Sequence, residues 1–147
     1  MGDQEKWDRR FLMDAAHHSV WSKDPSTKVG ALIVDNLRRI ISTGYNGPAK
    51  GVIDSDDRFF DRELKLALTL HAEQNAILFA KTDLTDCTIY VYPMEPCSIC
   101  ASMIIQTGIK RVVTIEPTPE QEERWGSNFE ISRQIFKETG VELVYIK

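Results

Sequence analysis

The stretch "CTIYVYPMEPCSICASMIIQTGIKRVVTIE", residues 87–116, decides the fold class. It begins with a β-branched and aromatic run that is typical of a buried strand, and residues 111–116 form a second such run. Between the two runs, residues 97–108 favour a helix that ends at Gly108, because glycine commonly follows a helix C-terminus. A helix between two strands favours a crossover that joins parallel strands.

The flanking sequence extends this pattern in both directions. Residues 29–35 and 39–45 are short apolar runs separated by "NLR", which predicts an antiparallel hairpin. Further helices are expected at residues 6–22, 58–81 and 119–140, the last with Gly126 as a candidate break. The final run, residues 141–146, is expected to form a strand parallel to its predecessor. The sequence therefore predicts an α/β protein with three layers, α/β/α, and a five-stranded mixed sheet.

Length and composition set the broad class. A chain of 147 residues fits one domain, so residues 1–147 are expected to fold as a single unit. The net charge of -4 counts against a protein that binds nucleic acid mainly through phosphates, and it favours a small substrate. The charged N-terminus lacks the apolar run of a signal peptide, and three cysteines do not suggest a disulfide framework. A cytoplasmic location is expected.

Two short motifs carry candidate metal ligands. In "PCSIC", Cys97 and Cys100 stand three residues apart at a helix start, so both sulfurs lie on one face. A helix N-terminus lowers the pKa of a thiol and favours the thiolate that zinc needs. In "LHAEQNAI", residues 70–77, His71 begins another helical run. Two thiolates and one imidazole suit a catalytic zinc site, because such sites keep a fourth position for water.

The acid next to His71 strengthens this interpretation. Glu73 follows the histidine by two residues, so its carboxylate could reach a water on the metal without being a ligand. A carboxylate in that position can take the proton of the water and deliver it to a substrate nitrogen.

Two other interpretations compete for the cysteine pair. A structural zinc would need a fourth ligand, for which Cys87, His17 and His18 are the candidates. Cys87 begins a strand pattern and is more typical of a small buried apolar residue. A thioredoxin-like redox role would leave His71 and Glu73 unexplained.

The arrangement H-x-E…P-C-x-x-C resembles that of the zinc-dependent nucleobase deaminases. The segments "SKDPSTKVGALIV", "IISTGYNGPAKG", "HAEQNAI" and "PCSICASMIIQTGIKRVV" look like the deoxycytidylate (dCMP) deaminase branch, over most of residues 22–113. The resemblance implies a cytidine deaminase-like fold and the conversion of dCMP to dUMP, which feeds thymidylate synthesis. It also implies a homohexamer, allosteric activation by dCTP, inhibition by dTTP, and Mg²⁺ accompanying the nucleotide.

The resemblance implies roles for single residues as well. His71, Cys97 and Cys100 match the zinc ligands, and Glu73 matches the catalytic proton shuttle. Asn46 would line the nucleotide pocket, the backbone of Ala72 would meet the pyrimidine edge, and the N–H of Ser98 would face the base or the bound water.

The substrate phosphate needs cationic or N–H donors. The turn "SKDPSTK", residues 22–28, offers Lys23, Ser26, Thr27 and Lys28. A phosphate contact from Lys23 or Lys28 is our hypothesis, and a plain solvated lysine is its alternative.

One segment departs from the family pattern. Many members carry extra Cys and His ahead of the H-x-E motif for a second zinc, whereas residues 47–70 contain neither type. We therefore expect one zinc per chain. The altered segment puts allosteric control in doubt and leaves room for a different nucleotide, such as dCTP or a 5-substituted dCMP.

Three rival functions remain open at this stage. One is deamination of free cytidine, cytosine or guanine. Another is a tRNA adenosine deaminase, which would need a basic groove for the flanking backbone. The third is a non-catalytic nucleotide-binding module, which would have no need for Glu73.

Overall fold

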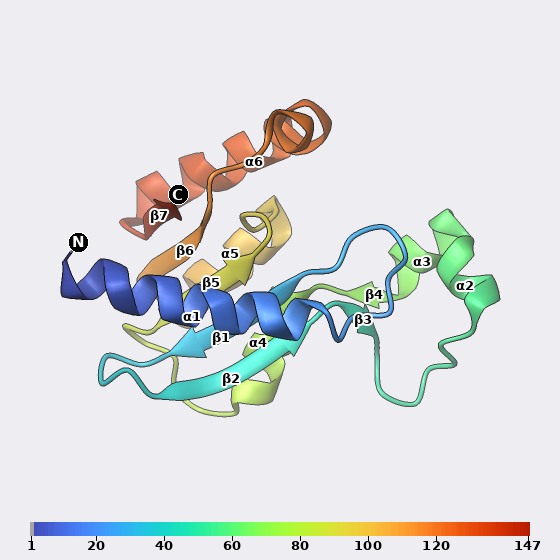
Figure 1. Ribbon diagram of the computed structural model, residues 1–147, viewed down its shortest axis with the longest axis horizontal. Coiled ribbons are helices and arrows are strands. Elements are labelled where there is room, and N and C mark those ends of the chain that lie inside the picture. Colours follow the sequence, from blue (N-terminus) through green and yellow to red (C-terminus); the bar gives the residue numbers. More distant parts are fainter. Residues whose placement is uncertain (1) are drawn as a thin grey trace.

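The computed structural model, which describes residues 2–147, has a five-stranded mixed sheet in the order β2-β1-β5-β6-β7 (Figure 1). Strands β1 (Gly30–Val34) and β2 (Ile40–Tyr45) form the predicted antiparallel hairpin. β5 (Thr88–Tyr92) pairs antiparallel with β1. β6 (Arg111–Ile115) is parallel to β5, and β7 (Glu142–Ile146) is parallel to β6. The predicted fold class and the direction of the last strand are confirmed.

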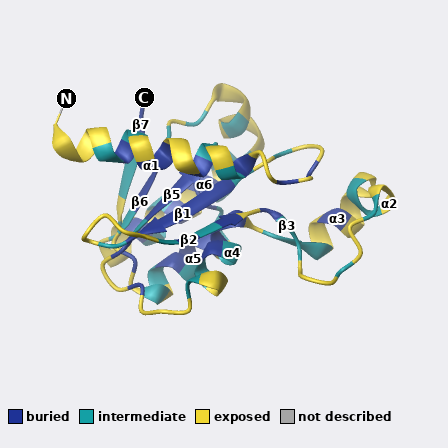
Figure 2. Cartoon of the chain, turned by 60° about the horizontal axis from the view of Figure 1, so that its bottom comes forward, coloured by how far each residue is buried: buried dark blue, intermediate teal, exposed yellow. Residues whose placement is uncertain are grey.

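Helices cover both faces of this sheet. α1 (Asp3–Ser19) packs on one face, in a buried cluster that includes Phe11, Leu32 and Tyr90. The other face is covered by α4 (Ala72–Ala80), α5 (Ser98–Thr107) and α6 (Pro119–Thr139). Figure 2 shows the result, with buried residues concentrated on the strands and on the inner sides of the helices. Alternate strand residues thus serve two separate cores, as the pleat requires.

Two glycines let helices approach the sheet closely. A Cβ on Gly30 would lie 2.0 Å from the carbonyl oxygen of Ala15 in α1. A Cβ on Gly44 would lie 2.4 Å from the carbonyl oxygen of Ala72 in α4. No side chain fits at either distance, so the absence of a Cβ at Gly44 sets the first turn of α4 against β2.

The prediction of one helix over residues 58–81 is wrong. The structure has α2 (Asp56–Phe60), α3 (Arg62–Leu68) and the short strand β4 (Thr69–Leu70) before α4, and β4 pairs with β3 (Gly47–Pro48). Asp61 interrupts the run with an extended backbone, φ -88° and ψ 98°, and its carboxylate accepts the N–H of Leu64 to cap α3. α2 and α3 project from the body of the sheet in both views (Figures 1 and 2).

Smaller differences concern the ends of helices. The first helix occupies Asp3–Ser19 rather than residues 6–22, and α6 continues through Gly126 without a break. Within residues 2–147, no helix combines the length and apolar character needed to cross a membrane.

Candidate metal and nucleotide site

The structure brings His71, Cys97 and Cys100 together. Nδ1 of His71 lies 3.5 Å from Sγ of Cys97 and 3.3 Å from Sγ of Cys100. The three ligand atoms all lie within 4.8 Å of one another. No fourth His, Cys, Asp or Glu joins this cluster in the described part of the chain.

These distances suit a shared metal ion. Zinc bonds of about 2.3 Å to sulfur and about 2.0 Å to nitrogen, at tetrahedral angles, separate the nitrogen from each sulfur by about 3.5 Å. The nitrogen–sulfur distances here are close to that value. The donor set of one imidazole and two thiols therefore fits zinc, and a tetrahedral ion bound by these three residues would keep one position for a non-protein ligand.

Each ligand is held by the start of a helix. His71 is the residue before α4, and its N–H is accepted by the side chain of Gln74 at 2.8 Å. Cys97 is the residue before α5, and Cys100 lies in the first turn of that helix. The short β4 strand and the loop after β5 therefore deliver the three ligands to one end of the sheet.

The pKa values of the two thiols are shifted in opposite directions. Hydrogen bonds from the Cys100 thiol and from His71 lower the pKa of Cys97 to about 4, although burial acts in the opposite direction. The pKa of Cys100 is raised by the same hydrogen bond and by its burial. Cys97 is therefore the thiolate that is ready to bind a cation.

Glu73 is buried beside this cluster, with 4% of its surface exposed. Burial is the main reason that its pKa is raised to about 7, against smaller opposing effects that include the charge of His71. A carboxyl group with this pKa can both hold and release a proton near neutral pH.

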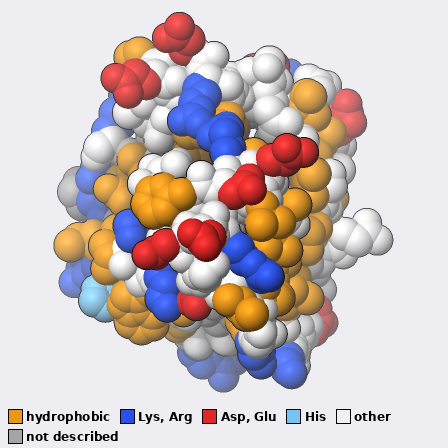
Figure 3. All heavy atoms as spheres, turned by 90° about the vertical axis from the view of Figure 1, so that its right-hand side faces the viewer, with side chains coloured by type: hydrophobic (Ala, Val, Ile, Leu, Met, Phe, Trp, Pro, Cys, Tyr) orange, Lys and Arg blue, Asp and Glu red, His pale blue; other side chains and the backbone are white. Residues whose placement is uncertain are grey.

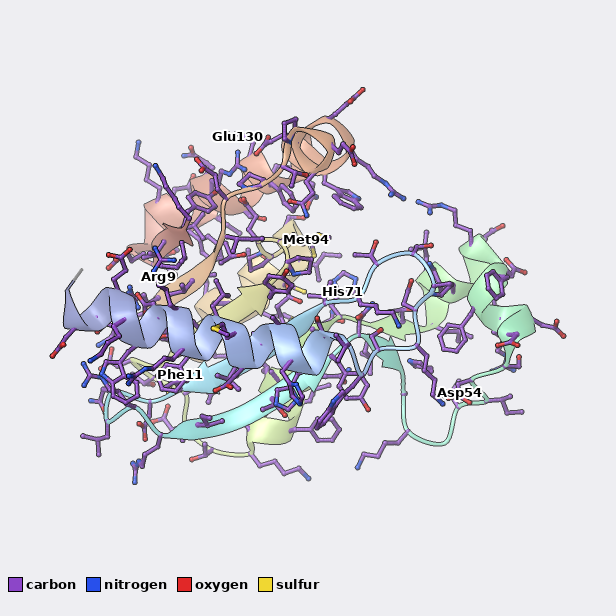
Figure 4. All side chains as sticks on the ribbon, in the orientation of Figure 1. Arg9, Phe11, Asp54, His71, Met94 and Glu130 are labelled. Atoms are coloured by element: carbon purple, nitrogen blue, oxygen red, sulfur yellow. The ribbon has the colours of Figure 1, made fainter. Side chains whose placement is uncertain are left out.

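The cluster opens into a cavity of about 480 Å³. This volume lies within the usual range for small-molecule sites. Its wall includes His71, Glu73 and Cys97, and Figure 4 shows His71 and Met94, another wall residue, near the end of the sheet. A ligand in the cavity would thus meet the buried carboxyl and the candidate metal site together.

Four of the residues predicted to contact substrate line this cavity, namely Ser26, Asn46, Ala72 and Ser98. The side-chain amide of Asn46 accepts the N–H of Val29 at 2.9 Å and donates to the carbonyl of Thr27 at 2.9 Å. The N–H of Ser98 donates to Oδ1 of Asn128 at 2.9 Å, so it is already engaged rather than free to face a base.

Lys23 and Lys28, the predicted phosphate contacts, do not line the cavity. Lys23 is exposed and pairs with Asp54 at 2.7 Å, beside a separate groove, and Figure 4 shows Asp54 on a loop away from His71. Nζ of Lys28 donates to the carbonyl oxygen of Ser22 at 2.5 Å. The turn that carries both lysines is fixed by Asp24, which accepts the N–H groups of Ser26 and Thr27.

Sequence reasoning missed the cations that do line the cavity. Arg62 begins α3, and Arg124 lies in α6. Neither guanidinium has an ion-pair partner among residues 2–147, although that of Arg124 lies 4.6 Å from the Trp125 ring centre. A third cation, Lys65, is neutralised by a buried ion pair with Asp24. Arg62 and Arg124 are separated by 62 positions and share no motif, so no sequence signal identified them as a pair.

The alternative metal ligands lie elsewhere. Cys87 is 3% exposed within the core cluster, as expected for a small buried apolar residue. His17 and His18 pack around Trp21 at the end of α1, where the ring centres of His18 and Trp21 are 4.5 Å apart. None of the three joins the cluster of His71 and the two cysteines.

Comparison with known proteins agrees with this geometry. Residues 5–116 match the family model of the cytidine and deoxycytidylate deaminase zinc-binding region. An uncharacterized deaminase in the luxG 3′ region of Aliivibrio fischeri is 48% identical over 141 residues, covering 96% of this chain and 94% of that protein. Human deoxycytidylate deaminase is 40% identical over 119 residues, which cover 76% of this chain and 65% of the human protein.

A solved structure extends the likeness to the fold. The dCMP deaminase from the cyanophage S-TIM5, in complex with dCMP and dUMP, superposes with a TM-score of 0.77 at 23% identity. The match covers 99% of each chain.

Proposed function

This chain belongs to the cytidine and deoxycytidylate deaminase family, and we propose that it hydrolyses dCMP to dUMP and ammonia. The observation that carries this proposal is the buried carboxyl of Glu73 beside His71, Cys97 and Cys100, at a cavity whose wall also includes Arg62 and Arg124. His71, Cys97 and Cys100 would hold one zinc ion per chain. When bound, zinc would supply an activated water for attack at C4 of the cytosine.

Glu73 is proposed to move the protons of the reaction. Its raised pKa, about 7, lets it accept a proton and then deliver it to N3 of the ring. A second transfer through the same carboxyl would allow ammonia to leave. Because Glu73 is almost fully buried, a bound base would shield these transfers from bulk water.

The cavity wall would position the base and sugar. Ala72 is fully buried at the start of α4, where its backbone is proposed to meet the pyrimidine edge. Trp125 of α6 also lines the cavity, and its ring is proposed to pack against the base. Asn46 and Ser26 are proposed to contact the nucleotide from the strand side.

The phosphate is proposed to lie between Arg62 and Arg124. Both arginines line the cavity, and a guanidinium binds phosphate oxygens with two parallel hydrogen bonds. This favours a nucleotide over free cytidine, cytosine or guanine. A polynucleotide is disfavoured, because Figure 3 shows basic side chains interspersed with acidic ones on the face that carries α2 and α3.

The proposal also covers the oligomeric state of the chain and its regulation by nucleotides. A homohexamer, the effectors dCTP and dTTP, and Mg²⁺ accompanying the effector rest on the family resemblance. Mass photometry and rate measurements with each nucleotide, with and without Mg²⁺, test all of them.

A substrate panel tests the central proposal. Ultraviolet absorbance would follow deamination of dCMP, dCTP, deoxycytidine, cytosine, guanine and a tRNA stem-loop by the zinc-loaded chain. We expect the highest kcat/KM with dCMP. Equal kcat/KM for deoxycytidine and dCMP would contradict the phosphate assignment, and activity confined to another substrate would contradict the proposed reaction.

A further inference from the structure

Helix α6 contacts the loop that carries the cysteines at three points. Nε2 of Gln121 donates to the carbonyl oxygen of Pro93 at 3.3 Å. The guanidinium of Arg133 donates to both carboxylate oxygens of Glu95, at 2.8 and 3.0 Å. Asn128, between them on α6, bonds to Ser98. The last contact involves the residue next to a candidate metal ligand, because Ser98 directly follows Cys97.

Asn128 makes two complementary hydrogen bonds to Ser98. Its Oδ1 accepts the backbone N–H at 2.9 Å, and its Nδ2 donates to the hydroxyl Oγ at 3.0 Å. The pair spans both the main chain and the side chain of one residue, so it fixes the direction of the first turn of α5. Hydrogen bonds of this kind orient metal ligands in other sites.

The first turn of α5 needs an acceptor from outside the helix. The first four N–H groups of a helix have no partner within it, and the residue before the helix usually supplies one from its side chain. Here that residue is Cys97, which makes no side-chain capping bond. Asn128 supplies an acceptor from outside the helix for the N–H of Ser98, the first of these groups, and the Cys97 sulfur lies toward His71.

The support behind Asn128 is firm. Phe129 and Phe136 of α6 are buried at 2% and 1% exposure, and Phe136 belongs to the core cluster beneath the sheet. Thr118 caps the start of the helix by accepting the N–H of Gln121. Asn128 therefore links a firmly packed helix, α6, to the first turn of α5.

We propose that Asn128 is a positioning residue for the metal centre, which holds the first turn of α5 so that Cys97 and Cys100 both face His71. This inference rests on the metal site of the proposed function but not on dCMP as its substrate. Asn128 is not a ligand, and it acts through Ser98.

The test measures metal binding directly. Asn128→Ala should weaken zinc binding by about 10- to 100-fold in competition with a chromophoric chelator. It should also change the visible absorption bands of the Co²⁺-substituted protein, which report the geometry of a tetrahedral thiolate site. Asn128→Asp keeps an acceptor for the N–H and for the Ser98 hydroxyl, so it should recover most of the affinity and the spectrum.

Matched variants separate positioning from general packing. Gln134→Ala removes an exposed side-chain bond to Glu138 on the same helix and should bind zinc as the wild type does. If Asn128→Ala does not fold, as judged by circular dichroism, Asn128→Leu replaces it, because leucine keeps the volume and lacks the hydrogen bonds.

Each result has a defined meaning. Wild-type zinc affinity and Co²⁺ spectrum in the Ala or Leu variant would overturn the inference. So would equal losses in the Asp variant, or a raised KM with unchanged metal binding, which would indicate a substrate contact. Failure of the wild-type chain to bind zinc would instead refute the metal centre of the proposed function.

Discussion

Nζ of Lys65 lies 3.1 Å from Oδ1 of Asp24, and both side chains are only 7% exposed in the cavity wall. The same oxygen accepts the N–H groups of Ser26 and Thr27, so this ion pair joins α3 to the turn before β1. Burial would raise the pKa of Asp24, but these hydrogen bonds and the charge of Lys65 outweigh it and leave the pKa below its usual value.

Removing one partner should therefore be costly. Lys65→Met leaves the Asp24 carboxylate buried without its cation, and we expect a loss of about 3 kcal/mol in the free energy of unfolding, measured with urea. Lys23→Met is the matched control, since its pair with Asp54 is exposed and its removal should leave the free energy of unfolding close to the wild-type value. Equal stability of the two variants would show that the buried pair has no special role.

Replacement of Glu73 by Gln should stop the chemistry while sparing the metal site. The amide cannot carry the proton, so kcat for dCMP should fall by about 10²- to 10⁴-fold. Zinc content, measured by atomic emission, should stay at the wild-type level. Wild-type turnover in Glu73→Gln would refute the assigned role.

The two arginines should discriminate between nucleotide and nucleoside. Loss of a charged hydrogen-bond partner is worth about 1.5–3 kcal/mol, so Arg62→Ala and Arg124→Ala should each reduce kcat/KM for dCMP by about 10- to 100-fold. The kcat/KM for deoxycytidine should change little. Lys23→Ala and Lys28→Ala serve as controls and should keep the wild-type preference for dCMP. A lost preference in the lysine variants alone would support the earlier hypothesis instead.

The position of Gly44 predicts a steric effect on the site. A Cβ there would lie 2.4 Å from the carbonyl oxygen of Ala72, so Gly44→Ala must push α4 away from β2. We expect a loss of about 1–3 kcal/mol in the free energy of unfolding, and weaker zinc binding because His71 precedes this turn. Gly47→Ala is a suitable control, since a Cβ at Gly47 meets nothing within 4 Å. Wild-type stability and zinc affinity in Gly44→Ala would show that α4 is not held by this contact.

Asp8, a buried acid away from the site, predicts how the free energy of unfolding changes at low pH. Burial of Asp8 would raise its pKa, but hydrogen bonds from Arg111, Tyr90 and Gln4 outweigh this and lower the pKa below 3.8. A lowered pKa in the folded chain means that Asp8 contributes its full stability above the unfolded value, near pH 4, and loses it as the pH falls further.

The measurement compares urea unfolding of the wild type and Asp8→Asn, with EDTA in every sample to exclude metal effects. The stability advantage of the wild type should be constant above about pH 5 and should shrink as the pH falls towards about 3. An advantage that does not depend on pH would mean that the charge of Asp8 contributes nothing.

Local spacing made the proposed metal ligands predictable, whereas the proposed phosphate contacts depend on tertiary structure. His71, Glu73, Cys97 and Cys100 stand in two short motifs at helix starts, where sequence distance fixes geometry. The strands followed from their β-branched runs in the same way. Lys23 and Lys28 have the charge that a phosphate contact needs, but their amino groups bind Asp54 and the carbonyl oxygen of Ser22.

Residues that meet from distant elements left no pattern to detect. Arg62 and Arg124 share a cavity because α3 and α6 border it, and Asn128 reaches Ser98 from 30 positions away. The break at Asp61 was missed for a different reason, since the composition of residues 58–81 suits a helix and a single capping carboxylate decided otherwise.

The projecting segment of α2 and α3 has an evolutionary consequence. None of its residues, from Asp56 to Leu68, belongs to either core cluster, yet Arg62, Lys65 and Leu66 form part of the cavity wall. Insertions, deletions or exchange of this arm could therefore alter which nucleotides are accepted while the sheet and the chemistry at its end are inherited intact. Substrate choice could therefore change through this arm, which the Lys65–Asp24 ion pair fastens to the turn before β1, without a change in the sheet.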